Sequence, residues 1–224
     1  MIEEIIEIDP EFSMGYYLLG SSYLNEVWFG WSKSREKSME MAVEFAQKAL
    51  DLDESSSYAH SLMGSIFLGK RQYDKAITWG KRAVTLSPNN SDIMAFFAIT
   101  LNNAGKPEEA ILFFKKAIRL NPFPPAFYLN SLGWAYRKAG QYEDAIKALK
   151  RARTIRPKFY IAHLILISNY SRLGRDSEAN AAVKEFLSLY PEFAITESLA
   201  KGGFDKDRAD WDLFVADLRK AGLK

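Results

Sequence analysis

The sequence predicts an all-α fold in which antiparallel helix pairs repeat along the chain. Pro88, Pro122, Pro157 and Pro191 close successive segments at intervals of 34, 35 and 34 residues. Within each segment, apolar residues recur at spacings of three, four and seven, which places them on one face of an α-helix. A short turn divides each segment into two such helices. Repeats of this length indicate a solenoid, whose units are stable because they stack on one another.

The clearest unit runs from Ala126 to Pro157, with its turn at 138–141. Gly133 and Ala145 are small where the two helices must approach closely. A bulky side chain at either position would overpack the crossing, at a cost of roughly 1–3 kcal/mol. The apolar faces of the two helices carry Leu129, Leu132, Gly133 and Tyr136, then Ala145, Leu149 and Ala152.

The same pattern begins again at Ser57, Ser91 and Tyr160, and at Ser13 in a copy with added residues. The four regular copies agree in small residues, large residues and turn. This pattern resembles the tetratricopeptide repeat. The resemblance implies a right-handed superhelix, with the first helix of each pair on the concave side and capping helices at the C-terminal end.

Both ends of the chain depart from the regular pattern. Residues 7–10 resemble the end of a repeat's second helix, and the matching first helix is missing. We expect a piece of a longer chain; the alternative is a complete protein whose first helix is a cap. The expected divisions are a half-repeat at 1–12, a repeat at 13–56 with an inter-helix insertion at 25–38, repeats at 57–90, 91–125, 126–159 and 160–192, and a C-terminal capping segment at 193–224.

The insertion adds ten residues to the first repeat and carries Trp28, Phe29 and Trp31 around Gly30. We expect these aromatic residues to lie in a loop, where they have two alternative roles. They could fold back and cover the open end of the first helix pair. They could also form an exposed patch for a partner, since aromatic side chains dominate binding hot spots.

The C-terminal segment contains a chain break at Gly202 and Gly203, followed by a helix over 205–221. A solenoid needs a terminal helix that hides the last repeat's apolar face and offers a polar face to water. Capping is therefore one role for this helix, and dimerisation through the same apolar face is the other. That face carries Trp211, Phe214, Val215 and Leu218.

Composition excludes several classes of function. The net charge of +2 gives no electrostatic reason to expect nucleic acid as a partner. The absence of cysteine excludes disulfides, thiolate metal sites and cysteine nucleophiles. No apolar run approaches the ~20 residues that span a bilayer, and the acidic start is unlike a secretory signal. We therefore expect a cytoplasmic protein without membrane insertion.

Nothing in the sequence indicates an enzyme or a cofactor. The two histidines, His60 and His163, both occupy the fourth position of a repeat, where core packing is expected. They lie three repeats apart and cannot share a metal ion. No zinc-protease motif, glycine-rich phosphate loop or nucleophile elbow occurs. We expect neither catalytic residues nor a bound cofactor.

Three longer stretches narrow the resemblance. Residues 29–53, 121–146 and 204–223 are similar to the first-repeat insertion, central repeat and C-terminal cap of one family: bacterial class III adenylate/guanylate cyclases with a C-terminal repeat region. The resemblance covers nearly the whole chain and implies a regulatory or interaction module, without the cyclase catalytic domain. Arg35 departs from it, standing where that family's turn has proline. Related regions also follow other signalling or DNA-binding domains, so the resemblance does not decide which domain precedes these repeats in a longer protein.

The concave surface is the predicted site for a partner. Asparagine amides can pair with the backbone of an extended peptide, and arginine can bind a carboxylate. The alternative is that the candidate residues on this surface are ordinary solvated positions. The strongest cluster comprises Asn102, Asn103, Asn130, Trp134 and Arg137, and the full candidate groove adds Tyr17, Tyr58, Asp92 and Arg172.

These observations predict a protein–protein interaction module, with the regulatory region of a larger signalling protein such as a nucleotide cyclase as the first hypothesis. One alternative is a free-standing adaptor that binds an extended peptide in its groove. Another is a homodimer formed through Trp211, Phe214 and the insertion. The expected partner in each case is a protein or a peptide.

Overall fold

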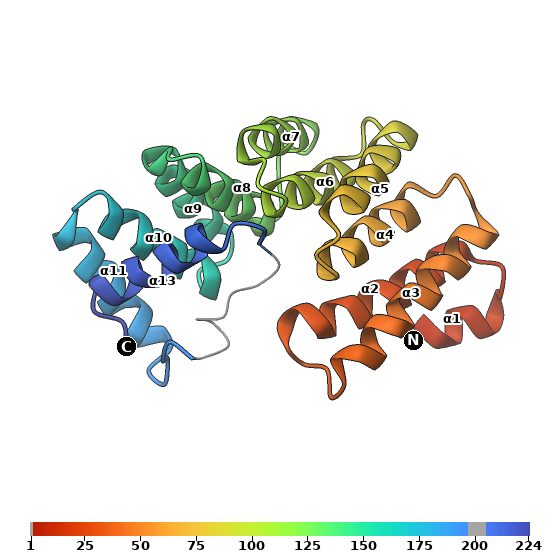
Figure 1. The fold of residues 1–224 in the computed structure, drawn as a ribbon, viewed down its shortest axis with the longest axis horizontal. Helices are drawn as coiled ribbons and strands as arrows, with labels where there is room; N and C mark the ends of the chain where they lie inside the picture. The colour runs from red at the N-terminus through yellow and green to blue at the C-terminus, as the bar shows by residue number, and fades with distance from the viewer. Residues whose placement is uncertain (1, 197–204) are drawn as a thin grey trace. The chain divides into compact units, whose positions relative to one another are not determined.

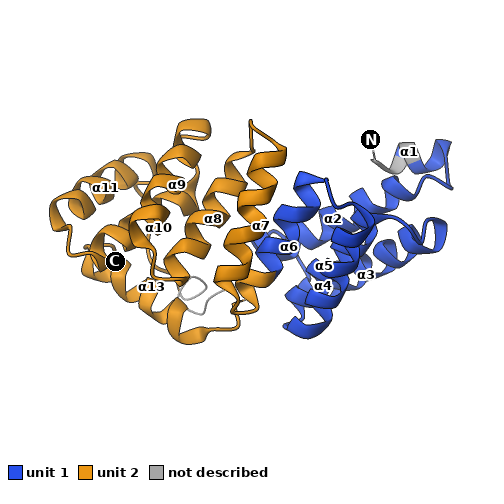
Figure 2. Ribbon diagram, turned by 90° about the horizontal axis from the view of Figure 1, so that it is seen from above, with its two compact units in different colours: residues 1–100 blue, residues 101–224 orange. Residues whose placement is uncertain are grey.

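The computed structural model describes residues 2–196 and 205–224 (Figure 1). These residues form twelve α-helices and no strand, which confirms the all-α prediction. The chain divides into two compact units, residues 1–100 and 101–224 (Figure 2). The predicted chain break at Gly202 and Gly203 lies outside the described residues, as do Met1 and the rest of 197–204.

The helices follow one another along the chain as pairs joined by short connections. Their bounds are α1 Ile2–Ile8, α2 Ser13–Phe29, α3 Arg35–Leu52, α4 Ser57–Gly69, α5 Tyr73–Leu86, α6 Ser91–Asn103, α7 Pro107–Leu120, α8 Ala126–Lys138, α9 Tyr142–Ile155, α10 Tyr160–Arg172, α11 Asp176–Leu189 and α13 Arg208–Lys220.

The four regular pairs share one design. In each, the first helix has 13 residues and the second has 14. The second residue of each connection has a positive φ, which reverses the chain between the helices. Glycine adopts this conformation without a steric penalty, whereas a residue with a Cβ is strained in it. The four residues are Gly105, Gly140, Gly174 and, against the trend, Arg71 with φ 57°.

The ten extra residues of the first pair lengthen its helices. α2 has 17 residues and α3 has 18, four more than their regular counterparts, and the connection at 30–34 is two residues longer than the one at 70–72. The expectation that Trp28, Phe29 and Trp31 all lie in a loop is therefore wrong for the first two, because α2 runs to Phe29 and only 30–34 lies outside the helices. Leu24 and Val27 continue the apolar spacing of α2 and are both buried, which favours the longer helix.

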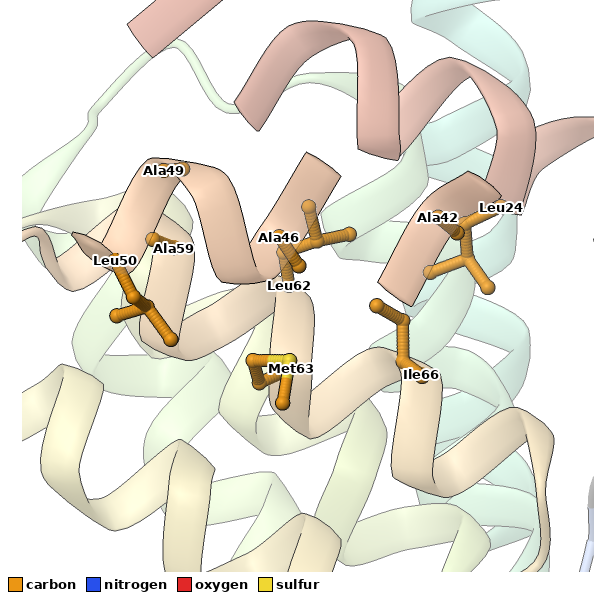
Figure 3. Close-up of a cluster of buried hydrophobic side chains, with 9 residues drawn as sticks. All are labelled: Leu24, Ala42, Ala46, Ala49, Leu50, Ala59, Leu62, Met63 and Ile66. Carbon is orange, nitrogen blue, oxygen red and sulfur yellow. The ribbon is translucent and has the colours of Figure 1, made fainter. Parts of the chain in front are cut away.

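The core of the first unit lies between α2, α3 and α4 (Figure 3). Small residues let these helices approach: Ala42, Ala46 and Ala49 of α3 are fully buried. A Cβ placed on Gly20 of α2 would lie 2.8 Å from Cδ2 of Leu62 in α4. The close approach leaves no room for a larger side chain at that position.

In the second unit, helices also approach closely at a small residue, and the side chains packed around them are larger. Phe114, Leu149 and Phe186 are fully buried in α7, α9 and α11. A Cβ placed on Gly133 would lie 2.6 Å from Cγ of Leu149, so α8 and α9 cross at a position where only glycine fits. The expected close approach at Gly133 is confirmed.

Candidate protein-interaction surfaces

The structure separates the predicted groove residues into two sets with different surroundings. Tyr17, Tyr58 and Asp92 belong to the first unit, on α2, α4 and the start of α6. The remaining residues belong to the second unit, on the end of α6, α8 and α10: Asn102, Asn103, Asn130, Trp134, Arg137 and Arg172.

In the first unit, three consecutive first helices present a partly exposed polar and aromatic row. The rings of Tyr17 and Tyr58 lie 5.2 Å apart between centroids, inclined at 49°. Asn90 donates from Nδ2 to the hydroxyl of Tyr58 at 3.0 Å. Its Oδ1 accepts from the backbone N–H of Asp92 and Ile93 at the start of α6. Asn90 thus fixes both the Tyr58 ring and the first turn that carries Asp92.

The electrostatics of this row favour the neutral tyrosine. Burial raises the pKa of Tyr17 above its ordinary value of 10.0, the Ser21 hydrogen bond lowers it, and the neighbouring Tyr58 and Asp92 raise it further. The Tyr17 hydroxyl therefore stays protonated at neutral pH. A protonated phenol can both donate and accept a hydrogen bond, as the backbone of a bound segment requires.

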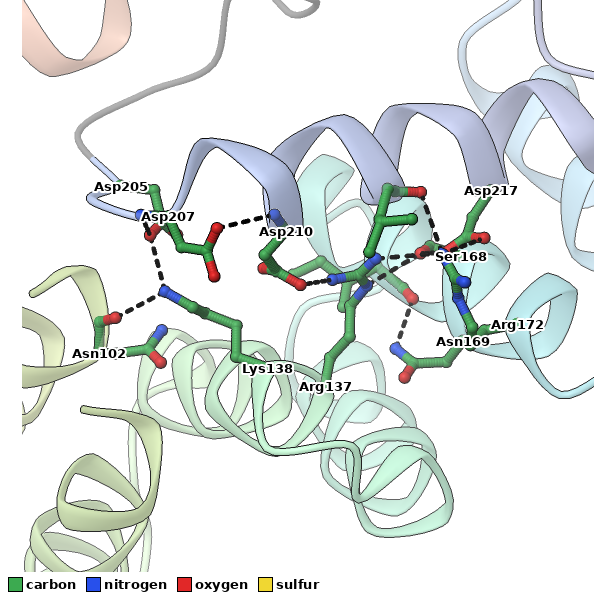
Figure 4. A network of polar contacts seen from close by, with 12 residues as sticks. Asn102, Arg137, Lys138, Ser168, Asn169, Arg172, Asp205, Asp207, Asp210 and Asp217 are labelled. Carbon is green, nitrogen blue, oxygen red and sulfur yellow. Dashed lines mark hydrogen bonds and ion pairs between the residues drawn. The ribbon is translucent and has the colours of Figure 1, made fainter. Parts of the chain in front are cut away.

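In the second unit, the predicted groove is already filled. Asn102 is 2% exposed and Arg137 is 3% exposed, and Asn130 is buried as well. Residues 205–220, including α13, lie over Arg137, Lys138 and the end of α6 that carries Asn102 (Figure 4). The prediction of an open surface at Asn102, Asn130 and Arg137 is therefore wrong. The reason is that acidic side chains of this segment bind the cations of α8 and α10.

Arg137 is the centre of this contact. Its guanidinium donates to Oδ1 of Asp210 at 2.8 Å, to Oδ2 of Asp217 at 3.1 Å and to Oγ of Ser168 at 3.0 Å. Arg172 of α10 donates to the same Asp217 at 2.9 Å. Two arginines from successive first helices therefore share one buried carboxylate (Figure 4).

A second ion pair anchors the segment that precedes α13. Lys138 donates from Nζ to Oδ1 of Asp205 at 2.7 Å and to the carbonyl oxygen of Asn102 at 2.8 Å. The backbone N–H of Lys206 donates to the carbonyl oxygen of Asn103 at 2.9 Å. Burial raises the pKa of the Asp205 carboxyl, while the Lys138 ammonium lowers it.

Aromatic rings complete the contact. The ring of Trp134 in α8 lies 4.9 Å from that of Phe214 and 5.6 Å from that of Trp211, both in edge-on arrangements. Phe214 is fully buried within the chain. Phe214 is therefore not available to a homodimer, because Trp134 and Arg137 of α8 lie against its ring, and the expectation is wrong for this residue; for Trp211 and the insertion it stays a prediction.

Sequence reasoning missed the three aspartates that hold α13 and the residues before it to the groove. Asp205, Asp210 and Asp217 lie in the C-terminal segment, where the prediction rested on the apolar face alone. A signal was present: Asp210 and Asp217 are seven residues apart, so they share a helical face with Phe214. The cationic side chains that were predicted on α8 and α10 are the residues with which these aspartates form ion pairs.

The three aromatic residues of the insertion divide between the two predicted roles. Trp28 packs against the first unit's core. Phe29 and Trp31 are 62% and 72% exposed, and their rings stack 4.8 Å apart. One aromatic residue thus supports the fold, and two form an exposed pair beside Gly30.

The histidines have the core positions that were expected. Both are buried, with His60 Nδ1 2.9 Å from the carbonyl oxygen of Ser56 and His163 Nε2 2.8 Å from that of Pro157. In the described part of the chain, no group of three or more acidic, histidine or cysteine side chains is arranged to hold a metal ion. Of the helices described, none combines the length and apolarity needed to span a membrane.

Comparison with known proteins identifies the repeats. Family models for the tetratricopeptide repeat match residues 42–91, 92–124 and 126–159, together more than half of the chain. The transcriptional regulator HilA of Salmonella typhimurium is 28% identical over 147 residues, which is 66% of this chain and 26% of HilA. The chain thus spans about a quarter of that relative's length.

Two solved structures share the fold. PilW, a type IV pilus biogenesis factor, superimposes with a TM-score of 0.72 at 20% identity, over 93% of this chain and 88% of PilW. YrrB, a TPR protein with an unusual peptide-binding site, gives a TM-score of 0.58 at 19% identity, over 86% of this chain and 93% of YrrB. The repeat pattern, the family models and these structures agree, and the chain belongs to the tetratricopeptide repeat family.

Proposed function

We propose that this chain is a protein-interaction module and that the row Tyr17, Tyr58 and Asp92 is where it binds an extended segment of a partner. The single observation that carries the proposal is the arrangement of these side chains on three successive first helices, in which Asn90 fixes Tyr58 and the turn that carries Asp92. YrrB has a peptide-binding site on the same fold, and this likeness supports the proposal.

The chemistry of the row suits a peptide backbone. Two phenol groups supply donors and acceptors, and their rings supply apolar area at low conformational cost. Asp92 adds a carboxylate that can bind a cationic side chain or an N–H group. These features favour recognition of an extended segment over catalysis, and we propose a binding role without an enzymatic one.

A displayed library of random peptides, selected against the intact chain, tests this proposal. We expect the selected peptides to lose affinity at least tenfold, about 1.4 kcal/mol, when Tyr17→Ala and Tyr58→Ala are combined. Tyr142→Phe, at the start of α9 in the other unit, is the control and should change nothing. Circular dichroism establishes that the double variant is folded. Unchanged affinity in a folded double variant would refute the proposed site.

The chain is also proposed to be the regulatory part of a larger bacterial signalling protein in the cytoplasm, with a nucleotide cyclase as the first candidate. The resemblance of residues 29–53, 121–146 and 204–223 to a cyclase repeat region supports this. HilA shows that a similar region occurs within a much longer regulator. The mass of the natural gene product, followed by a cyclase assay with and without these repeats, tests the link. A natural product of 25.5 kDa would contradict it.

The exposed pair Phe29 and Trp31 is a second candidate surface for the same function. Their stacking and exposure are the observations that favour it. The double variant Phe29→Ser and Trp31→Ser should keep the free energy of unfolding within about 0.5 kcal/mol, because surface substitutions rarely do more. Lost partner binding would then assign the pair to recognition. Retained binding would leave Tyr17 and Tyr58 as the interaction site.

A further inference from the structure

The segment 205–220 crosses three successive first helices of the second unit. Lys206 bonds to Asn103 at the end of α6, and Asp210 bonds to Arg137 of α8. Further along, Asp217 bonds to Arg172 of α10, and Lys220 donates to the carbonyl oxygen of Ser171, also in α10. The resemblance to the repeat family implies that first helices line the concave side, so this segment lies against the surface predicted to bind a partner.

We propose that the groove of α8 and α10 is a second binding site, for an acidic amphipathic helix of a partner protein, and that α13 occupies this site within the chain. The partner helix carries two carboxylates seven residues apart with an aromatic residue between them. Such a helix competes with α13 for Arg137 and Arg172. The inference rests on the proposed function, since both take the chain for a protein-binding module.

The chemistry of the α13 contact is that of a recognition surface. A helix needed only to cover apolar surface would do so with apolar side chains, because burying charge carries a desolvation penalty. Here, two arginine–aspartate pairs and a lysine–aspartate pair hold the segment, and the cationic side chains of all three pairs, Arg137 and Lys138, are buried. Charge complementarity of this kind contributes specificity and selects one class of partner against others.

Beside the contact with residues 205–220, several buried side-chain oxygen atoms have no hydrogen-bond donor among the described residues. They are Oδ1 of Asn102, Oδ2 of Asp205 and Oδ2 of Asp210. A buried acceptor without a donor weakens a contact, because it has lost its hydrogen bonds to water. A partner helix that supplied donors to these oxygen atoms would make hydrogen bonds that the described residues do not make there.

The resident helix also defines what the partner must present. Asp210, Phe214 and Asp217 stand at positions i, i+4 and i+7, and these share one face of a helix. Asp210 and Asp217 meet Arg137, and Phe214 lies against Trp134 with the Arg137 guanidinium 5.4 Å from its ring centre. A cationic helix would meet Arg137 and Arg172 with like charge and would be rejected.

A labelled peptide with the sequence of residues 205–224 is the probe, and the intact chain is the receptor. We expect weak binding to the unaltered chain, where α13 holds the site. The chain with Asp210→Asn and Asp217→Asn should bind the peptide at least tenfold more tightly, because its own helix has lost both carboxylates. Adding Arg137→Gln to that variant should abolish binding. Asp212→Asn, an exposed position on α13, is the matched control and should bind as the unaltered chain does.

Hydrogen exchange on the unaltered chain provides a measurement that does not depend on any variant folding. Saturating peptide should accelerate amide exchange in α13 and leave α9 protected. Equal peptide affinity for the unaltered and Asp210→Asn/Asp217→Asn chains, with unchanged exchange in α13, would overturn the proposal. So would exchange of α13 between two copies, seen as a dimer by light scattering, because the second occupant would then be this chain itself. Failure of the Tyr17 and Tyr58 test would leave these outcomes unaffected, since that surface belongs to the first unit.

Discussion

Arg137 donates a hydrogen bond to Asp217 at 3.1 Å across 80 residues of sequence, and both side chains are buried. This contact joins the C-terminal helix to the middle of the repeat array. It is supported by Asp210 on one side and by Ser168 and Arg172 on the other. The predicted peptide groove of the second unit therefore has an occupant in the chain itself.

Removal of the Asp217 carboxylate should be strongly destabilising. Asp217→Ala leaves Arg137 buried with fewer partners, and loss of one member of a buried pair costs about 3–5 kcal/mol. Asp212→Ala, on the exposed face of the same helix, removes a surface pair with Arg208 and should cost less than about 1 kcal/mol. Urea unfolding of both variants measures the difference. Equal midpoints would show that Asp217 has no such role.

The glycine at the crossing of α8 and α9 should not tolerate a methyl group. Gly133→Ala brings a Cβ to 2.6 Å from Cγ of Leu149, and overpacking costs about 1–3 kcal/mol, partly offset by the better helix propensity of alanine. In Gly69→Ala the nearest atom is the flexible end of Met39 at 3.1 Å, so that variant should be close to neutral. Thermal unfolding separates them, and a neutral Gly133→Ala would contradict this packing.

Arg71 occupies the left-handed position that glycine holds in the next three repeats. Its φ of 57° is strained for a residue with a Cβ. Arg71→Gly should therefore stabilise the chain by about 0.5–1 kcal/mol, after allowance for the extra entropy of glycine in the unfolded state. Gly140→Ala, at the equivalent position with φ 72°, should destabilise by a similar amount. Opposite shifts in the urea midpoint are expected, and shifts of the same sign would refute this explanation.

His163 should make the chain less stable in mild acid. Burial lowers the pKa of His163 below its ordinary value of 6.5, opposed by the Pro157 hydrogen bond, with Arg153 lowering it further and Glu185 raising it. Below pH 6.5 the unfolded chain therefore binds a proton more readily than the folded chain, and stability falls as the pH falls. The stability advantage of the unaltered chain over His163→Gln should shrink between about pH 7.5 and pH 5. A constant difference would show that His163 does not titrate in this way.

The repeat architecture could be predicted because it is local. The spacing of Gly133, Ala145 and Leu149 reports which side chains must fit between two adjacent helices, and no distant part of the chain changes that requirement. The insertion was harder, since ten added residues can form a loop or extend two helices. Leu24 and Val27 keep the helical apolar spacing and carry the information that decided the outcome.

The candidate site could be predicted only in part, because its surroundings are non-local. Asn102 and Arg137 occupy positions on the first helices that are open in an isolated repeat. Whether they remain open depends on residues 205–220, which lie far along the chain. The repeat pattern alone does not predict this contact. The opposite charges of Asp210 and Asp217 and of the arginines on α8 and α10 do indicate it. Tyr17 and Tyr58 remain predictions for a partner surface.

A double-mutant cycle on Arg137 and Asp217 tests the central claim most directly. Arg137→Ala, Asp217→Ala and the combined variant are unfolded in urea, and the interaction energy is taken from the three changes in unfolding free energy. Residues in direct contact within one polar network interact by about 0.5–3 kcal/mol, and we expect more than about 1 kcal/mol here. Changes that add to within about 0.5 kcal/mol would contradict the claim that α13 fills the groove through this ion pair.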